Sequence, residues 1–427
     1  MNTVRSRAAA VALLVGACAG SLFEPTSQED ISNVRQIYVS IGDLFMEGRT
    51  KEEREEAALN LAMHARSAKD GGEFIVDRRG VNPLVNILKA SSGSTAKTKQ
   101  AAAITLTWIA RRRPHFADLI ANAGGIEAFV DLMRDGDSKA RDWAMLGLGT
   151  LATDRPNITW AITELGAIPR VVKLLRIGSQ KEKTKAVGAL AIFSRHNVSR
   201  YIALSGGVRP LVALLSEGDE EQATKAAMTL AHVAMSSTEN AALIGQAEAI
   251  PTFGALLTMG TPSMVEWTSL ALAWLGKDHP PNRDRMGQGN CIVPLINLVA
   301  NGTIVQSTHA ILALTAAATD HAENAALIVE AGGIPALVEV ARTGSEQVQG
   351  KAAIMLARLA VAHDDHLVAI TAAGGIDGRQ ALQAAQMAFA TFGMHNDTYP
   401  LVDALASIGN TQFRLDLGGD KDEVYTR

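Results

Sequence analysis

A short pattern of glycine and aliphatic residues recurs eight times along the 427 residues of this chain. Its clearest copies read Gly124-Gly125-Ile126 and Gly332-Gly333-Ile334-Pro335. The aliphatic member, called the anchor below, recurs from Val81 to Ile376 at spacings of 45, 42, 40, 42, 42, 42 and 42 residues. A fixed period of this length is typical of a repeat array, in which each unit buries its apolar faces by stacking on its neighbours. The period therefore predicts one elongated domain instead of two or three globular ones.

The residues before each anchor predict a short first helix that ends at the glycine pair. An apolar residue stands six positions before every anchor: Ile75, Ile120, Ile162, Ile202, Ile244, Met286, Ile328 and Ile370. Asn157, Asn197 and Asn240 stand near the expected helix starts, where a short polar side chain accepts from free backbone N–H groups. Gly207 and Gly333 are expected to close first helices with a positive φ.

Two more helices are expected in each repeat. Apolar residues at positions 0, 3, 6 and 7 from the anchor share one face of a second helix. Ten residues after six consecutive anchors a glycine is expected to stop that helix: Gly136, Gly178, Gly218, Gly260, Gly302 and Gly344. A longer third helix follows, rich in Ala and Leu, as in residues 225–234 and 351–360. Small Ala side chains let helices approach closely, which accounts for 4% aromatic residues in a chain that is 47% hydrophobic.

Three helices of this order, with Gly-Gly-Ile-Pro between the first two, resemble the armadillo repeat over residues 38–376. The resemblance implies an all-α, right-handed α–α superhelix of about eight three-helix repeats with degenerate ends. It also implies a concave groove, lined by third helices, on which such proteins usually bind other proteins.

The ends of the chain depart from the repeat. Residues 1–37 are expected to form an N-terminal helix or cap, 38–376 the array, 377–409 degenerate cap helices, and 410–427 a flexible tail. The apolar run of residues 8–19 allows two interpretations. It resembles a third helix of a further repeat, or a signal peptide with Ala17-Cys18-Ala19 at its cleavage site. The first places the protein in the cytoplasm, or the nucleus; the second makes it secreted or membrane-attached. No membrane span is expected after residue 22.

Composition and motifs argue against an enzyme. The net charge of −4 gives no basic field for nucleic acid, and two cysteines give no disulfide framework. The sequence contains no recognisable arrangement of nucleophile and base, no phosphate-binding loop and no metal-ligand spacing. No catalytic residue, cofactor, metal or small-molecule substrate is therefore expected. The group from His363 to His366 is interpreted as a helix start, with metal binding the alternative. Arg111-Arg112-Arg113 suits a helix C-terminus, with contact to an acidic partner the alternative.

The groove itself is expected at one position of each third helix, where several armadillo proteins carry an Asn that binds an extended peptide. The candidate partner-binding residues there are Trp108, Thr150, Ile192, His232, Trp274 and Arg358, with Met63 and Ala316 completing the series. None is Asn. The sequence therefore predicts a protein-interaction scaffold or adaptor. A nuclear-transport-type peptide carrier or a non-catalytic subunit of an enzyme complex are the alternatives. Trp108 and Trp274 are interpreted either as partner contacts or as core residues between adjacent third helices.

Overall fold

The computed structural model describes residues 28–46, 48–67, 70–77, 79–89 and 92–373. These residues form 24 α-helices, and no strand occurs among them. The all-helical repeat fold predicted from the sequence is confirmed. The candidate signal segment, the C-terminal cap helices, the tail and the eighth anchor, Ile376, lie outside the described residues.

The helices follow the predicted order of first, second and third in each repeat. The first helices are α4 (Gly71–Asp77), α7 (Phe116–Asn122), α10 (Pro156–Glu164), α13 (Ser199–Leu204), α16 (Thr238–Gln246), α19 (Pro280–Gln288), α22 (Ala322–Glu330) and α25 (Asp364–Ala372). The second helices are α2 (Gln28–Phe45), α5 (Val81–Leu88), α8 (Gly125–Asp135), α11 (Ala167–Ile177), α14 (Val208–Glu217), α17 (Ala249–Met259), α20 (Ile292–Asn301) and α23 (Gly333–Thr343). The third helices are α3 (Lys51–Ser67), α6 (Ala96–Arg112), α9 (Ser138–Ala152), α12 (Gln180–Phe193), α15 (Glu220–Ser236), α18 (Pro262–Gly276), α21 (Ile304–Ala318) and α24 (Glu346–Ala362).

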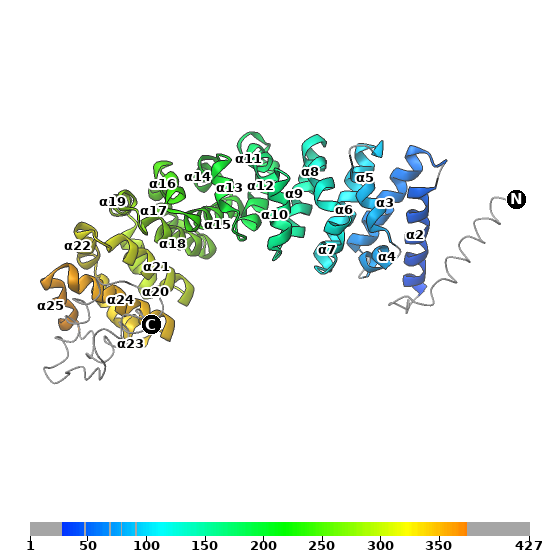
Figure 1. Ribbon diagram of the computed structural model, residues 1–427. Coiled ribbons are helices and arrows are strands. Elements are labelled where there is room, and N and C mark those ends of the chain that lie inside the picture. The colour runs from blue at the N-terminus through cyan, green and yellow to red at the C-terminus, as the bar shows by residue number, and fades with distance from the viewer. Residues whose placement is uncertain (1–27, 47, 68–69, 78, 90–91, 374–427) are drawn as a thin grey trace, which may run out of the picture. The chain divides into compact units, whose positions relative to one another are not determined.

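The chain divides into two compact units, residues 1–205 and residues 206–427. Within the first unit each third helix packs on the next, from α3 through α6 and α9 to α12. Second helices α5, α8 and α11 lie along one edge of this unit and first helices α4, α7 and α10 along the opposite edge (Figure 1). The second unit repeats the arrangement, with α15, α18, α21 and α24 packed in sequence.

The predicted anchors form the core of each repeat. All seven described anchors, from Val81 to Ile334, are buried. The apolar residues six positions earlier are buried as completely, Ile75 and Met286 among them. At about 25 cal/mol per Å² of apolar surface, stacking these faces is the main stabilising term of such an array.

The turn between first and second helices depends on one left-handed residue. Its φ is positive in every described repeat: Arg79, Gly124, Gly166, Gly206, Glu248, Asn290 and Gly332. The expectation for Gly207 and Gly333 was therefore off by one residue, because Gly206 and Gly332 carry the positive φ. Gly333 is needed for a different reason: a Cβ there would lie 2.6 Å from Ile328 Cγ2 and 2.7 Å from its carbonyl oxygen.

The polar residues at the first-helix starts also differ from expectation. The caps are Ser237, His279 and His321, which accept from backbone N–H groups three residues later. Asn240 donates its backbone N–H to Ser237 Oγ at 3.2 Å and its side-chain Nδ2 to Ser236 Oγ of third helix α15 at 2.8 Å. Its counterpart Asn282 is fully buried and donates through Nδ2 to carbonyls of the preceding first helix, Ala241 at 3.0 Å, and third helix, Leu275 at 2.8 Å. These asparagines tie neighbouring helices together, where the sequence suggested that they cap single ones.

Because Glu248 is the left-handed residue of its turn, Glu248→Gly is expected to stabilise the protein. Its φ is +60° and its side chain makes no capping hydrogen bond. Relief of left-handed strain exceeds the added backbone entropy, so the free energy of unfolding should rise by about 0.5–1 kcal/mol. Urea denaturation checks this. Glu339→Gly, an exposed position inside α23, is the control and should lose about 1 kcal/mol. Equal losses in both variants would contradict the account of the turn.

The turn between second and third helices is closed by the six predicted glycines. Each is the C-cap of its helix, in an extended conformation. A Cβ at Gly178 would lie 2.4 Å from the carbonyl oxygen of Leu174, and the other five are similarly tight. In all six repeats the next residue is the N-cap of the third helix. Ser179 caps α12 in a capping box with Glu182.

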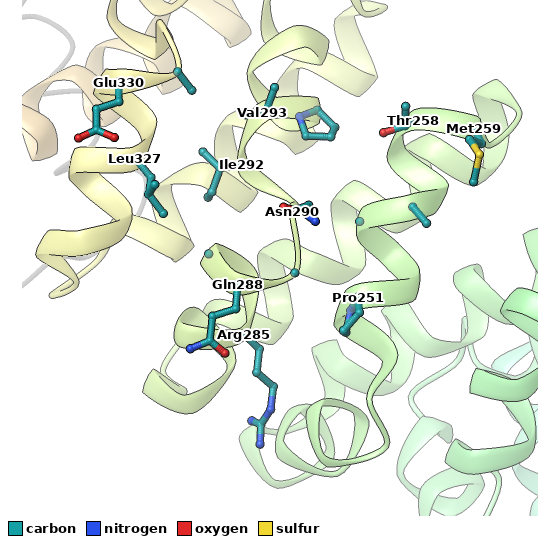
Figure 2. Close-up of a pocket in the computed structure, with 16 residues that line it drawn as sticks. Pro251, Thr258, Met259, Arg285, Gln288, Asn290, Ile292, Val293, Leu327 and Glu330 are labelled. Carbon is teal, nitrogen blue, oxygen red and sulfur yellow. The ribbon is translucent and has the colours of Figure 1, made fainter.

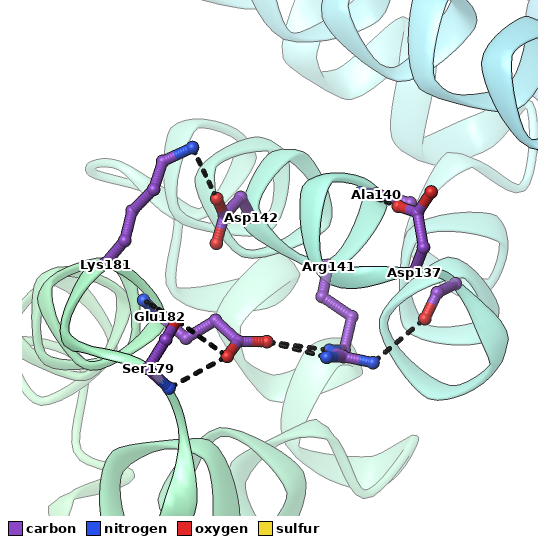
Figure 3. Close-up of polar contacts among 8 residues, drawn as sticks. Asp137, Ala140, Arg141, Asp142, Ser179, Lys181 and Glu182 are labelled. Carbon is purple, nitrogen blue, oxygen red and sulfur yellow. Dashed lines mark hydrogen bonds and ion pairs between the residues drawn. The ribbon is translucent and has the colours of Figure 1, made fainter.

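This cap also links two adjacent third helices (Figure 3). Glu182 Oε1 accepts from Arg141 Nη2 of α9 at 2.7 Å, while its Oε2 accepts from Ser179 N at 3.0 Å. Arg141 in turn donates to the carbonyl oxygen of Gly136 at 3.0 Å. A second pair, Lys181 with Asp142, lies beside the first at 2.9 Å. Hydrogen bonds from the Ser179 backbone and from Arg141 lower the pKa of Glu182 to about 2.

Glu182→Gln is expected to destabilise the protein by about 1–2 kcal/mol at neutral pH. Gln222 and Gln306 hold the same place in intact capping boxes, so the variant keeps the cap and loses the charge pair with Arg141. The pKa of Glu182 is depressed on folding, so its contribution is complete above about pH 4.5 and declines as the pH falls toward 2. Urea titrations across this range should show the two proteins converging. Glu164→Gln, on exposed α10 surface, should show no difference from the parent at any pH.

No single helix among the described residues is long and apolar enough to cross a membrane. One bent pair, α22 with α23, has the length and composition, with a 77° bend between its halves.

Candidate partner-binding face

The predicted groove residues all lie on third helices, and none is fully buried. Trp108, Thr150 and Ile192 are partly exposed on α6, α9 and α12 of the first unit. His232 and Trp274, on α15 and α18, are partly exposed in the second unit. So are Ala316 on α21 and Arg358 on α24. Met63 on α3 is 59% exposed.

These residues form one row of a wider surface. On α6, α9, α12, α15, α18, α21 and α24, residues seven and four before the row and three after it share the same side of each helix. We call these four rows the third-helix face. Of its 27 positions with a described side chain, 26 are accessible to solvent and only Ala101 is buried. Packing within each unit therefore leaves this face at least partly accessible.

The row four residues earlier is apolar on every helix but one. It holds Ile104, Leu146, Gly188, Met228, Leu270, Leu312 and Ile354. Each is partly exposed. Within each unit, accessible apolar side chains on successive third helices suit contact with another macromolecule.

Aromatic rings and cations pair on this face in the second unit. Lys277 Nζ lies 4.5 Å from the ring centroid of Trp274, within cation–π range. His232 meets Trp267 of the next third helix edge to face, with ring centroids 5.3 Å apart. Trp267, seven residues before Trp274, was not among the predicted site residues.

Arg358 is the most enclosed cation of the face. Its Nη1 donates to Thr319 Oγ1 of the neighbouring third helix at 3.0 Å. Burial lowers the pKa of Arg358, and nearby Asp320 opposes that effect. The same unit places Arg283 nearby, buried and donating to the carbonyl oxygens of Gly276 and Thr319 at 2.9 and 2.7 Å.

Trp108 of the first unit is held differently. The guanidinium groups of Arg111 and Arg112 lie 5.3 and 5.8 Å from its ring. Its indole Nε1 is buried and has no hydrogen-bond partner among the described residues. Arg112 also donates to the carbonyl oxygen of Arg66. Arg113 pairs with Asp70 and Glu73 of α4. The basic cluster thus lies at a helix end, as predicted, and most of it is engaged within its own unit.

A pocket of about 940 Å³ lies in the second unit between first and second helices, namely α17, α19, α20 and α22 (Figure 2). Val293, Leu327 and Met259 on its wall are exposed apolar residues, and Arg285 and Glu330 line its polar part. The pocket shows no convergence of acid, base and nucleophile, and the sequence did not predict it.

The described residues hold no catalytic constellation. No group of three or more His, Cys, Asp or Glu residues is placed to bind a metal there. Burial raises the pKa of Cys291 to about 12, which keeps its thiol protonated and unreactive. His363, a candidate metal ligand, accepts through Nδ1 from the backbone N–H of Asp365 at 3.2 Å, as the capping interpretation predicts.

Comparison with known proteins bears on the fold alone. No family model matches the chain, and no curated protein matches it. An engineered protein of solved structure aligns over 87% of this chain and 97% of its own, with 24% identity and a TM-score of 0.64. A second engineered protein aligns over 56% of this chain and 96% of its own, with 28% identity and a TM-score of 0.51. A designed armadillo repeat protein aligns over 55% of this chain and 99% of its own, with 23% identity and a TM-score of 0.52.

The fold is an armadillo-type α-solenoid. Armadillo-type arrays of this kind are helical repeat proteins suited in general to binding other proteins, and such folds are typically non-catalytic. The third-helix face is one surface that packing within each unit leaves accessible.

Proposed function

We propose that this chain is a non-catalytic protein-interaction scaffold whose third-helix face binds a segment of a protein partner. The observation that carries the proposal is the accessibility of that face, 26 of 27 described positions, together with the apolar row on the third helices of each unit. Stacking between repeats explains why apolar residues on the other sides of these helices are buried. It does not explain the partly exposed apolar residues of this row. Contact with a partner supplies a physical reason for their exposure.

The aromatic residues of the face are the proposed centre of binding. Trp274 and Trp267 present large rings that are already ordered by Lys277 and His232. Ordered aromatic side chains lose little entropy on binding and commonly dominate interface energies. A nuclear-transport-type carrier remains the alternative, but the positions where such carriers hold Asn are occupied here by other residues, so nothing on the face favours it.

Trp274→Ala is expected to weaken partner binding by about 2 kcal/mol or more while thermal melting changes little. The partner is first obtained by affinity capture and then purified for titration. If Trp274 is instead a core residue, the same variant should lose about 3–5 kcal/mol of stability. Trp160→Ala is the matched control, because Trp160 is an exposed indole on first helix α10, away from the face. Unchanged binding by a well-folded Trp274→Ala protein would refute the proposed site at this position.

We also propose a cytoplasmic location with residues 1–19 retained, in keeping with the resemblance of residues 7–13 to a third helix. Mass spectrometry of the protein from its native cell is expected to find this segment intact. A mature chain starting at Cys18 or Gly20 would overturn the proposal and indicate a secreted or membrane-attached protein.

A further inference from the structure

Charge is distributed unevenly over the second unit. Residues 206–427 contain 12 basic and 23 acidic residues, a net charge of −11, whereas residues 1–205 carry 28 basic and 21 acidic residues, a net charge of +7. Despite this excess of acid, the third-helix face of the second unit contains no Asp or Glu. It carries four cations instead: Lys225, Lys277, Lys351 and Arg358.

Most carboxylates of this unit lie outside the face, although Glu221 pairs with Lys225 and Asp320 lies near Arg358. Glu239, Asp284 and Glu323 are exposed on first helices, and Glu339 is exposed on second helix α23. Glu221 of α15, Glu266 of α18 and Glu346 of α24 lie on third helices but outside the four rows of the face. Within a unit of net negative charge, these four rows therefore carry cations and no carboxylate.

We propose that the partner segment bound by the second unit is an acidic stretch of polypeptide, with carboxylates beside aliphatic or aromatic side chains. The inference rests on the proposed function and names the chemistry of its ligand. The apolar row of Met228, Leu270, Leu312 and Ile354 has cations on both sides. Lys225 and Lys351 lie on one side; Lys277 and Arg358 lie on the other. An extended peptide crossing these rows would place apolar side chains at the centre and carboxylates at the margins.

The margins are built to accept carboxylates. Arg358 is held by Thr319 at 3.0 Å, so its planar guanidinium is ordered before a ligand arrives. Lys277 lies against the Trp274 ring, where a carboxylate beside an apolar side chain meets both charge and aromatic surface. Lys225 already pairs with Glu221 of its own helix, so it contributes less than the others. Partial burial strengthens charge pairing with a ligand relative to pairing at a fully exposed site.

Charge also decides between a peptide and a nucleic acid. A polyphosphate strand is attracted by a broad basic field, and this unit has a net charge of −11. A peptide with a few carboxylates contacts only the local cations of the face. Its aliphatic residues match the apolar row, for which a sugar–phosphate backbone has no counterpart.

Selection from a random peptide library displayed against the full chain tests the proposal. Enriched sequences are expected to carry more Asp and Glu than Lys and Arg, next to Leu, Ile, Phe or Trp. Enrichment of basic or charge-neutral sequences at the same face would overturn the acidic-partner inference and leave the proposed function standing. If no sequence is enriched, or if the enriched ones are unaffected by Trp274→Ala, the proposed function fails as well. Binding of a labelled single-stranded oligonucleotide in preference to the peptides would contradict both.

Paired charge reversals give the quantitative test. Lys277→Glu with Arg358→Glu is expected to weaken the most enriched acidic peptide at least tenfold in fluorescence anisotropy, and the charge-reversed peptide should bind this variant better than the parent. Because Arg358 is largely enclosed, Lys277→Glu with Lys351→Glu is measured beside it, and circular dichroism verifies folding. Arg209→Glu with Arg342→Glu is the matched control, since both arginines are exposed on second helices and the change in net charge is identical. Equal weakening by the control pair would show that only net charge matters and would overturn the inference.

Discussion

No repeat of this chain buries its apolar surface alone, and the rest of the structure depends on that constraint. Each three-helix unit has an anchor and a partner residue six positions earlier, such as Ile334 and Ile328, which are buried only when adjacent helices stack. The Ala-rich sides of the third helices pack against adjacent third helices, and other sides pack against first and second helices. What remains accessible on each third helix is one narrow face. The candidate site is thus a by-product of how the core is made.

Much of the fold follows from the sequence because its signals are periodic. A glycine that recurs ten residues after the anchor marks a steric requirement, since a Cβ at Gly178 would meet the carbonyl oxygen of Leu174. The misplacement of the positive φ shows the limit of that reasoning. Two adjacent glycines are both required, Gly332 for its left-handed backbone and Gly333 for close approach to Ile328, and composition does not say which plays which part. Other repeats separate the two roles, because Glu248 and Asn290 occupy the left-handed position without glycine. The residues that follow them, Ala249 and Cys291, occupy the position of Gly333.

The site was less predictable, for a physical reason. The row containing Trp108 and Trp274 could be placed by register with known armadillo repeats, but a single row does not define a surface. Trp267 and the apolar row that includes Leu270 are recognised as parts of one face only when the solvent exposure of each residue on the helix is known. A sequence signal did exist. Seven residues before the groove row, Trp143, Lys185, Trp267 and Lys351 recur where a stacked helix would hold Ala.

Some residues of the third-helix face also connect one third helix to the next. Thr319 accepts from Arg358 across two helices, so the bond that orders the cation also holds adjacent repeats in register. His232 and Trp267 do the same between α15 and α18. A ligand that contacted several third helices at once would therefore add to the coupling between repeats, which in an array comes mainly from nearest neighbours. Binding and stability are consequently linked, because a partner that binds only the folded array stabilises it by mass action. Within either unit, an extended ligand crosses more boundaries between third helices than a compact one of equal contact area, so it adds more to the coupling between adjacent repeats.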